Sequence, residues 1–166
     1  YVLMRASLAR YDEDPGNGKP HVLEGETADG TPCLVYYDKG VGTDRWQHGS
    51  GGAFGAGLGA NVREAYAFLA DRLRQDDELY LTGFSRGAFT VRSLAGMLGC
   101  AGLPGSGGND AVEAAWDYYR TPPKRPPRED WLGRFNPRDV PIRFLGVYDT
   151  VGSLGGPIPQ LSWLHG

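Results

Sequence analysis

A serine flanked by two glycines provides the strongest chemical signal in this sequence. Gly83, Ser85 and Gly87 alternate in the segment GFSRG, a GxSxG pattern that can expose a serine on a sharp turn between a strand and a helix. A serine hydroxyl is a poor nucleophile at neutral pH, so it needs a neighbouring base and donors that stabilise an oxyanion. The backbone N–H of Arg86 is the candidate donor. We therefore predict that Ser85 is a nucleophile.

The context of this motif matters, because a bare GxSxG is a weak signal in a chain with 26 glycines. An apolar run at residues 78–82 predicts a strand, and residues 88–98 carry apolar side chains at helical spacing. Strand, tight turn and helix form the setting that an activated serine requires. The alternative is an ordinary turn in which the Ser85 hydroxyl caps the helix.

Asp149 is the candidate for the acidic member of a catalytic triad. It follows an apolar run at residues 142–148, which we interpret as a wholly buried strand. In the chain order serine, acid, histidine, the acid orients and stabilises the histidine that deprotonates the serine. The alternative is an aspartate that caps a turn through its own backbone.

The histidine of such a triad has no good candidate in this sequence. His165 follows Asp149 but stands next to the last residue, and we interpret it as a loop residue. His21 and His48 precede the serine and would break the chain order. No histidine has another ligand type at i,i+4 spacing, so we predict neither a metal site nor a cofactor.

Composition narrows the classes of function. The chain has 166 residues and a formal net charge of -3 without long runs of one sign, so it predicts no nucleic-acid-binding surface. Its apolar stretches are far shorter than the roughly 20 residues that span a bilayer, which predicts a soluble protein of the cytoplasm. Cys33 and Cys100 lie far apart and are expected to be small buried side chains rather than a disulfide or zinc pair.

The remaining segments predict strands that alternate with helices. Residues 1–11 have the pattern of the middle of a helix, which predicts that the chain is a fragment. Residues 31–38 predict a strand, 112–119 predict a short helix, and 61–75 predict a helix with Asn61 as its N-cap.

Two further segments are interpreted as loops. The glycine-rich stretch 49–59 is expected to be a mobile loop or lid near the active edge, with anion binding as the alternative. The proline-rich residues 120–130 predict a surface insertion without regular structure.

Continuous apolar strands that alternate with helices predict an α/β fold, with a mostly parallel sheet and helices on both faces. We interpret residues 1–166 as a single partial domain. In a parallel sheet, Ser85 and Asp149 would emerge at the same edge because each follows a strand.

Two other groups of side chains have open interpretations. Arg86 could contact a phosphate head group or lie on the helix surface. Trp116, Tyr118 and Tyr119 are predicted to pack between elements, and the alternative is a lipid-facing surface.

The chain also resembles a known family through four blocks that occur in the family's order: YYDKGVGT, GAGLGANVREAYAFLADRL, ELYLTGFSRGAFTVRSLAGMLG and FLGVYDTVGSLG. This is the uncharacterised α/β-hydrolase domain family that includes the catalytic domain of type VI secretion phospholipase effectors. The resemblance covers most of residues 34–102 and 142–155. It implies an α/β-hydrolase-like fold, Ser85 as nucleophile, Asp149 as acid, and a catalytic histidine beyond Gly166. In that family an Asp-Gly-Thr motif on the first core strand lies upstream of such a segment.

The resemblance implies an esterase or lipase that cleaves acyl esters, with phospholipid as the substrate and peripheral contact with a membrane. It further implies export by type VI secretion, with the secretion apparatus or an immunity protein as partner. Two other classes stay open. One is a non-catalytic relative that serves as a binding or delivery module, and the other is a structural domain whose GxSxG is coincidental. The last predicts a deeply buried Ser85.

Overall fold

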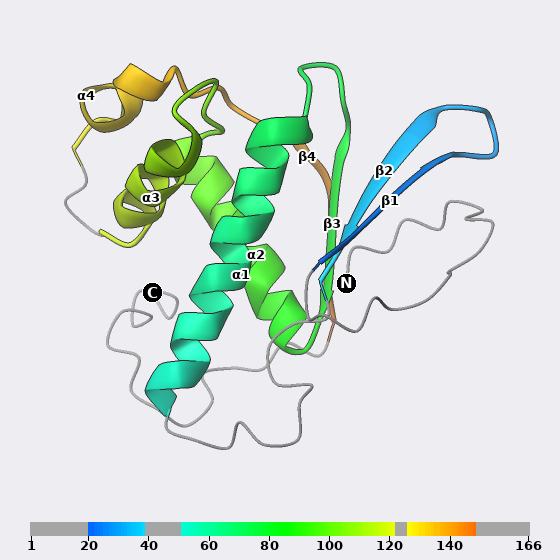
Figure 1. Ribbon diagram of the computed structural model, residues 1–166, viewed down its shortest axis with the longest axis horizontal. Coiled ribbons are helices and arrows are strands. Elements are labelled where there is room, and N and C mark those ends of the chain that lie inside the picture. Colours follow the sequence, from blue (N-terminus) through cyan, green and yellow to red (C-terminus); the bar gives the residue numbers. More distant parts are fainter. Residues whose placement is uncertain (1–19, 39–50, 122–125, 149–166) are drawn as a thin grey trace.

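The computed structural model describes residues 20–38, 51–121 and 126–148 of the chain. The elements, in chain order and shown in Figure 1, are β1 (His21–Glu26), β2 (Pro32–Tyr37), α1 (Gly51–Arg72), β3 (Leu79–Phe84), α2 (Arg86–Ala101), α3 (Gly108–Tyr119), α4 (Arg128–Leu132), the 3-10 helix η1 (Gly133–Phe135) and β4 (Ile142–Tyr148). The helix predicted at residues 1–11 lies outside the described residues.

β3 and β4 form a parallel pair that matches part of the predicted sheet. Phe84 pairs with Tyr148 at the carboxyl ends of the two strands, and Thr82 pairs with Gly146. β2 pairs with β1 instead, in an antiparallel hairpin. Strands and helices are therefore mixed around a small parallel sheet, as an α/β arrangement requires, but the described sheets are two-stranded.

β1 was not predicted from the sequence. Its two glutamates make the segment look polar, since Glu24 and Glu26 face solvent while Leu23 and Gly25, which alternate with them, are half-buried. The signal that could have found the hairpin is Asp29-Gly30, a dipeptide typical of tight turns between strands. Gly30 has a φ of 81°, and the turn is closed by the Thr27 N–H, which donates to the Thr31 carbonyl over 2.9 Å.

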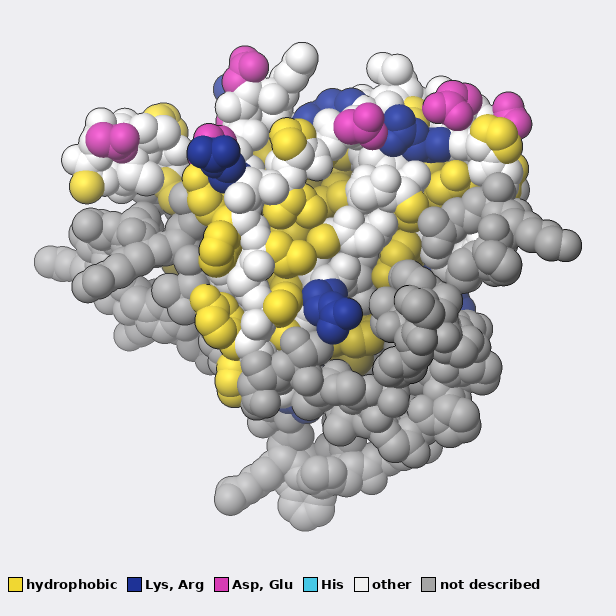
Figure 2. All heavy atoms as spheres, turned by 180° about the vertical axis from the view of Figure 1, so that it is seen from behind, with side chains coloured by type: hydrophobic (Ala, Val, Ile, Leu, Met, Phe, Trp, Pro, Cys, Tyr) yellow, Lys and Arg dark blue, Asp and Glu magenta, His cyan; other side chains and the backbone are white. Residues whose placement is uncertain are grey.

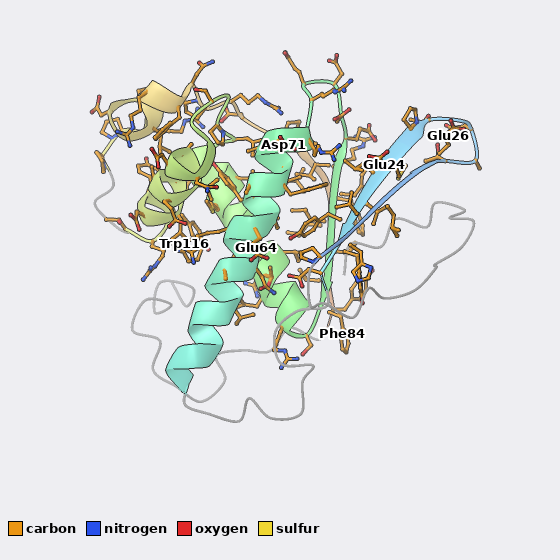
Figure 3. The ribbon with its side chains drawn as sticks, in the orientation of Figure 1. Glu24, Glu26, Glu64, Asp71, Phe84 and Trp116 are labelled. Carbon is orange, nitrogen blue, oxygen red and sulfur yellow. The ribbon has the colours of Figure 1, made fainter. Side chains whose placement is uncertain are left out.

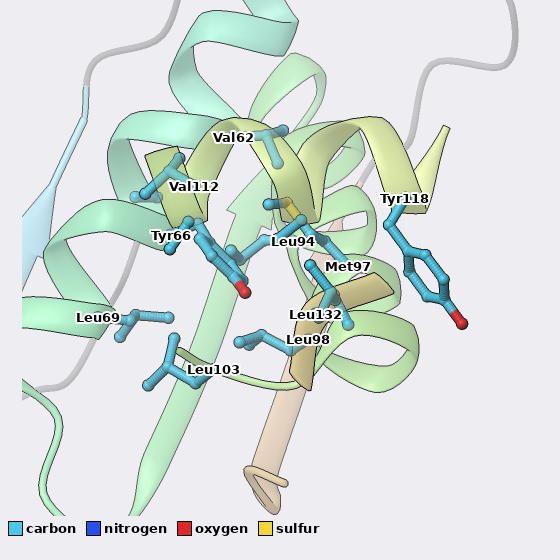
Figure 4. Packing of buried hydrophobic residues seen from close by; sticks show 14 of the residues in the cluster. Val62, Tyr66, Leu69, Leu94, Met97, Leu98, Leu103, Val112, Tyr118 and Leu132 are labelled. Atoms are coloured by element: carbon cyan, nitrogen blue, oxygen red, sulfur yellow. The ribbon is translucent and has the colours of Figure 1, made fainter. Parts of the chain in front are cut away.

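The core lies where α2 packs against both strands of the parallel pair and where α1 and α3 pack against α2. Figure 4 shows these side chains around Tyr66, which is fully buried and donates its hydroxyl to the Gly102 carbonyl over 2.7 Å. The predicted inward stripe of α2 is largely confirmed, because Val91, Leu94 and Leu98 are buried.

The expectation of a glycine-rich loop at residues 49–59 is wrong for the part that the structure describes. Residues 51–59 form the first turns of α1, so Asn61 lies inside the helix and is not its N-cap. Packing explains the difference: a Cβ on Gly59 would lie only 3.0 Å from the Trp116 ring, so a glycine lets α1 approach α3 closely. Burial of Leu58 in the same turn adds stability that outweighs the poor helix propensity of glycine.

Trp116, Tyr118 and Tyr119 pack between elements, as predicted. The Trp116 and Tyr119 rings lie 5.9 Å apart, and the Tyr119 ring covers Gly96 of α2. The buried Tyr118 donates its hydroxyl to the Pro126 carbonyl over 2.9 Å. These contacts tie α3 to α2 and to the chain that leads into α4.

Two other expectations need correction. α4 begins at Arg128 with Pro127 at its N-cap position, so the proline-rich segment is not irregular to its end at residue 130, while residues 122–125 lie outside the described part. β4 is not wholly buried: Phe144 is 47% exposed and Tyr148 58% exposed. Figure 2 shows hydrophobic side chains gathered on this face. Among the described residues, α2 packs on β4 but leaves these side chains uncovered.

Cys33 is buried and Cys100 is half-buried, and neither forms a disulfide. The prediction of small buried side chains is therefore confirmed for Cys33 and only in part for Cys100. None of the helices in the described part of the chain combines the length and the apolar character needed to cross a bilayer.

Candidate active site

Ser85 lies in the turn between the last residue of β3 and the first residue of α2. Its backbone adopts φ 51° and ψ -116°, although a side chain rarely tolerates a positive φ. Such a conformation costs about 1–3 kcal/mol and persists only where its surroundings enforce it. We call residues 83–87 the Ser85 turn.

Gly83 makes the sharpness of this turn possible. A Cβ at this position would lie 2.2 Å from the Gly87 carbonyl oxygen and 2.6 Å from the Ala88 nitrogen. The end of β3 and the start of α2 therefore approach each other more closely than any side chain allows. This is the physical requirement behind the first glycine of the motif.

Hydrogen bonds on both sides hold the backbone of Ser85. Its N–H donates to the Tyr148 carbonyl over 2.8 Å, and its carbonyl accepts from the Ala88 N–H over 3.0 Å and from the Phe89 N–H over 3.3 Å. The bond to Tyr148 joins Ser85 to the last residue of β4, and the bonds to the Ser85 carbonyl begin the helical hydrogen bonds of α2. Asp149 itself lies outside the described residues, but its chain neighbour Tyr148 thus lies beside Ser85.

The Ser85 hydroxyl makes no capping hydrogen bond to α2, although the residue stands at the N-cap position. The side chain is half-buried rather than deeply buried. The structure thus lacks both the cap expected of an ordinary turn and the deep burial expected of a coincidental motif.

Arg86 is the first residue of α2 and is half-buried. Backbone N–H groups in the first turn of a helix point toward its N-terminal end, where the helix dipole favours negative charge. The Arg86 N–H, which the sequence analysis singled out, therefore belongs to the positive end of α2. Figure 3 marks Phe84, the residue directly before Ser85, whose side chain is 51% exposed.

A groove of about 1010 Å³ begins beside the Ser85 turn. Gly87 and Thr90, from the first turns of α2, line one part of it, and Tyr36 and Asp38 at the end of β2 line another. α1 contributes both apolar and polar side chains, which are Ala65, Phe68 and Leu69 on the one hand and Asn61, Asp71 and Arg72 on the other. The sequence carried no local signal for this groove because its walls come from elements far apart in the chain.

The candidate ionisable residues are only partly placed. His48, Asp149 and His165 lie outside the described residues, and His21 is the first residue of β1. Among the residues that the structure describes, no group of three or more His, Cys, Asp or Glu side chains could hold a metal ion.

Comparisons with known proteins give one family. Residues 20–165 match the family described as "T6SS, Phospholipase effector Tle1-like, catalytic domain". The chain is also 30% identical over 157 residues to the uncharacterized protein YEL023C of Saccharomyces cerevisiae, a match that covers 78% of this chain and 23% of the yeast protein. The chain thus spans less than a quarter of the length of that relative. No solved structure matches it significantly.

Proposed function

Because the chain belongs to the family of Tle1-like catalytic domains of type VI secretion phospholipase effectors, we propose that it is a serine hydrolase that cleaves acyl esters through Ser85. The observation that carries the proposal is the strained backbone of Ser85 at a strand-to-helix turn, where its hydroxyl makes no capping bond. A strained turn of this kind supports a nucleophile elbow, which presents a serine to substrate above the carboxyl edge of a sheet.

The proposed reaction begins when the Ser85 oxygen attacks the ester carbonyl while its proton passes to a histidine. The Arg86 N–H and the positive end of α2 stabilise the negative charge on the carbonyl oxygen. The histidine then returns the proton to the departing alcohol, which leaves an acyl-Ser85 intermediate. Water, activated by the same histidine, hydrolyses this intermediate and releases the fatty acid.

Asp149 is the proposed acid of this triad, and the histidine lies outside the described residues. The register of the parallel pair supports this role for Asp149, since Phe84 and Tyr148, the residues just before Ser85 and Asp149, are paired. Gly83 and Gly87 are the elbow glycines, and the close approach of Gly83 to the Gly87 carbonyl supports that assignment.

We further propose an α/β-hydrolase fold in which residues 1–166 form one partial catalytic domain. The parallel pairing of β3 and β4 supports this fold. So does β2, which runs in the same general direction as β3 in Figure 1. Helices on both faces of a mostly parallel sheet would then require elements beyond those described.

The family description supports phospholipid as substrate, and with it peripheral contact with a membrane, because the scissile bond lies in a lipid. Export by type VI secretion, with the secretion apparatus or an immunity protein as partner, is the corresponding proposal for the whole protein. The Arg86 side chain is the candidate contact for a phosphate head group.

A fluorophosphonate probe tests the nucleophile in the intact gene product. We expect labelling of the native protein, loss of labelling in Ser85→Ala, and release of fatty acid from phospholipid vesicles by the native protein alone. The matched control is Ser106→Ala, at an exposed serine far along the chain from the Ser85 turn, which should label normally. A folded, histidine-containing native protein that does not label would overturn the hydrolase proposal and favour a binding or delivery module.

A further inference from the structure

Tyr36 carries a buried hydroxyl that the fold does not use. Its ring packs on the Phe68 ring with 4.7 Å between centroids. The hydroxyl oxygen is buried and has no hydrogen-bond partner among the described residues. Buried polar groups nearly always have a partner, so an orphaned hydroxyl calls for an explanation.

Other tyrosines of the chain provide the contrast. The buried hydroxyl of Tyr66 donates to the Gly102 carbonyl over 2.7 Å, and that of Tyr118 donates to the Pro126 carbonyl over 2.9 Å. Each of these bonds joins two segments of the fold. Tyr36 is half-buried as a residue, and its buried hydroxyl makes no such bond to any of the described residues.

The position of Tyr36 relates it to the Ser85 turn. Tyr36 is next to the last residue of β2, and it lines the groove that Gly87 and Thr90 also line. β2 and β3 run in the same general direction in Figure 1, so both strands end toward the same edge of the molecule. A molecule in this groove can therefore reach both Tyr36 and the start of α2.

The charges around Tyr36 select the kind of group that it can bind. Burial raises the pKa of the Tyr36 hydroxyl, and the negative charges of Asp38 and Glu64 raise it further. The hydroxyl therefore keeps its proton at neutral pH and serves as a donor. The same carboxylates oppose an anionic acceptor, which leaves an uncharged oxygen such as an ester carbonyl. Figure 3 marks Glu64 on α1.

The groove walls fit the rest of such a molecule. Phe68, Leu69 and Val91 line it with apolar surface from α1 and α2. Apolar surface of this kind gains free energy when an acyl chain displaces water from it. This part of the groove thus places apolar surface beside the Tyr36 hydroxyl, which has no hydrogen-bond partner among the described residues.

We propose that Tyr36 is a substrate-binding residue, whose hydroxyl donates a hydrogen bond to an uncharged ester carbonyl of an acyl substrate in this groove. The inference rests on the proposed hydrolase function and adds a residue and a substrate class to it. Tyr36 holds the acyl ester in the groove and takes no part in proton transfer.

The test compares Tyr36→Phe with the native enzyme in the intact gene product, with p-nitrophenyl octanoate as the uncharged ester. We expect KM to rise about fivefold or more, because the variant loses one hydrogen bond to the substrate. The value of kcat should change less than about twofold. The unfolding midpoint should stay the same or rise, because the variant removes an unpaired buried hydroxyl. The control is Tyr66→Phe, which loses an internal bond and should lower the midpoint without changing KM.

Three outcomes would count against Tyr36. An unchanged KM in a folded Tyr36→Phe protein would show that the hydroxyl does not bind substrate. A lowered unfolding midpoint would show that the hydroxyl has a structural partner in the intact protein. A fall in kcat with unchanged KM would place Tyr36 in the chemical step instead. Failure of the native enzyme to label with fluorophosphonate would overturn the hydrolase proposal itself. Normal labelling together with an unchanged KM would overturn only the role of Tyr36 and leave the hydrolase proposal intact.

Discussion

The two ends of α2 both have a backbone with positive φ, but they use different residue types. At the C-terminal end, Gly102 has a φ of 74°, and at the N-terminal end, Ser85 has a φ of 51°. Glycine takes a positive φ without steric cost because it has no Cβ. Serine does not, so the N-terminal end of α2 stores strain that its C-terminal end avoids.

The two ends of α2 also differ in how deeply they are buried. Gly102 lies in the core, where its N–H donates to the Leu98 carbonyl and its own carbonyl accepts from Tyr66. Ser85 is half-buried, and the Phe84 side chain before it is 51% exposed. A helix end that serves only packing uses the residue with least strain. The N-terminal end, where Ser85 carries its hydroxyl, has a strained backbone. Close backbone packing at Gly83 and the hydrogen bond from Ser85 to β4 keep this strained conformation in place.

The largest expected effect comes from Gly83→Ala, which would disrupt the strained turn at the N-terminal end of α2. The new Cβ would lie 2.2 Å from the Gly87 carbonyl oxygen, so the backbone must move. We expect the free energy of unfolding to fall by about 3 kcal/mol, measured by urea denaturation, and fluorophosphonate labelling to be lost.

Gly99→Ala is the matched control on the same helix. A Cβ at Gly99 meets nothing within 4 Å, so this variant should label normally and gain about 0.5–1 kcal/mol from better helix propensity. Normal stability and labelling of Gly83→Ala would contradict the close contact on which the Ser85 turn depends.

Gly102→Ala tests the relaxed end of α2 and should have the next largest effect. An alanine would be forced into a positive φ, and its Cβ would lie 2.8 Å from the Arg138 carbonyl oxygen. We expect a loss of about 2 kcal/mol in the free energy of unfolding, with labelling of the folded fraction retained. Loss of labelling in fully folded protein would mean that the two ends of α2 are coupled.

The smallest expected effect is a difference in stability between two variants of Ser85. It separates the backbone strain at this residue from the loss of its hydroxyl. Ser85→Ala and Ser85→Gly both remove the hydroxyl, but only glycine removes the Cβ that makes a positive φ costly. We expect Ser85→Gly to be about 1 kcal/mol more stable than Ser85→Ala in urea denaturation, after the entropic cost of glycine in the unfolded chain. Equal stability of the two variants would mean that Ser85 is not strained.

Local patterns predicted the elements next to the candidate site. The strand at residues 78–82 and the helix at 88–98 correspond to β3 and α2, because apolar spacing and a glycine-bounded turn act over a few residues. The prediction was wrong at residues 51–59, where glycines indicated a loop. Contact between Gly59 and Trp116 joins residues far apart in the chain, and such a contact has no local signature.

Local sequence patterns were enough to predict a serine between a strand and a helix, with glycines that permit a sharp turn. Those are local properties, and each depends on the covalent chemistry of a few neighbouring residues. The packing of distant segments was needed to learn that the Tyr148 carbonyl of β4 accepts from the Ser85 N–H and that β4 leaves apolar side chains exposed. It also revealed that the Tyr36 hydroxyl, beside a groove, has no hydrogen-bond partner among the described residues. The reason is physical: strand pairing and burial depend on which distant segments meet, and no short stretch of sequence contains that information.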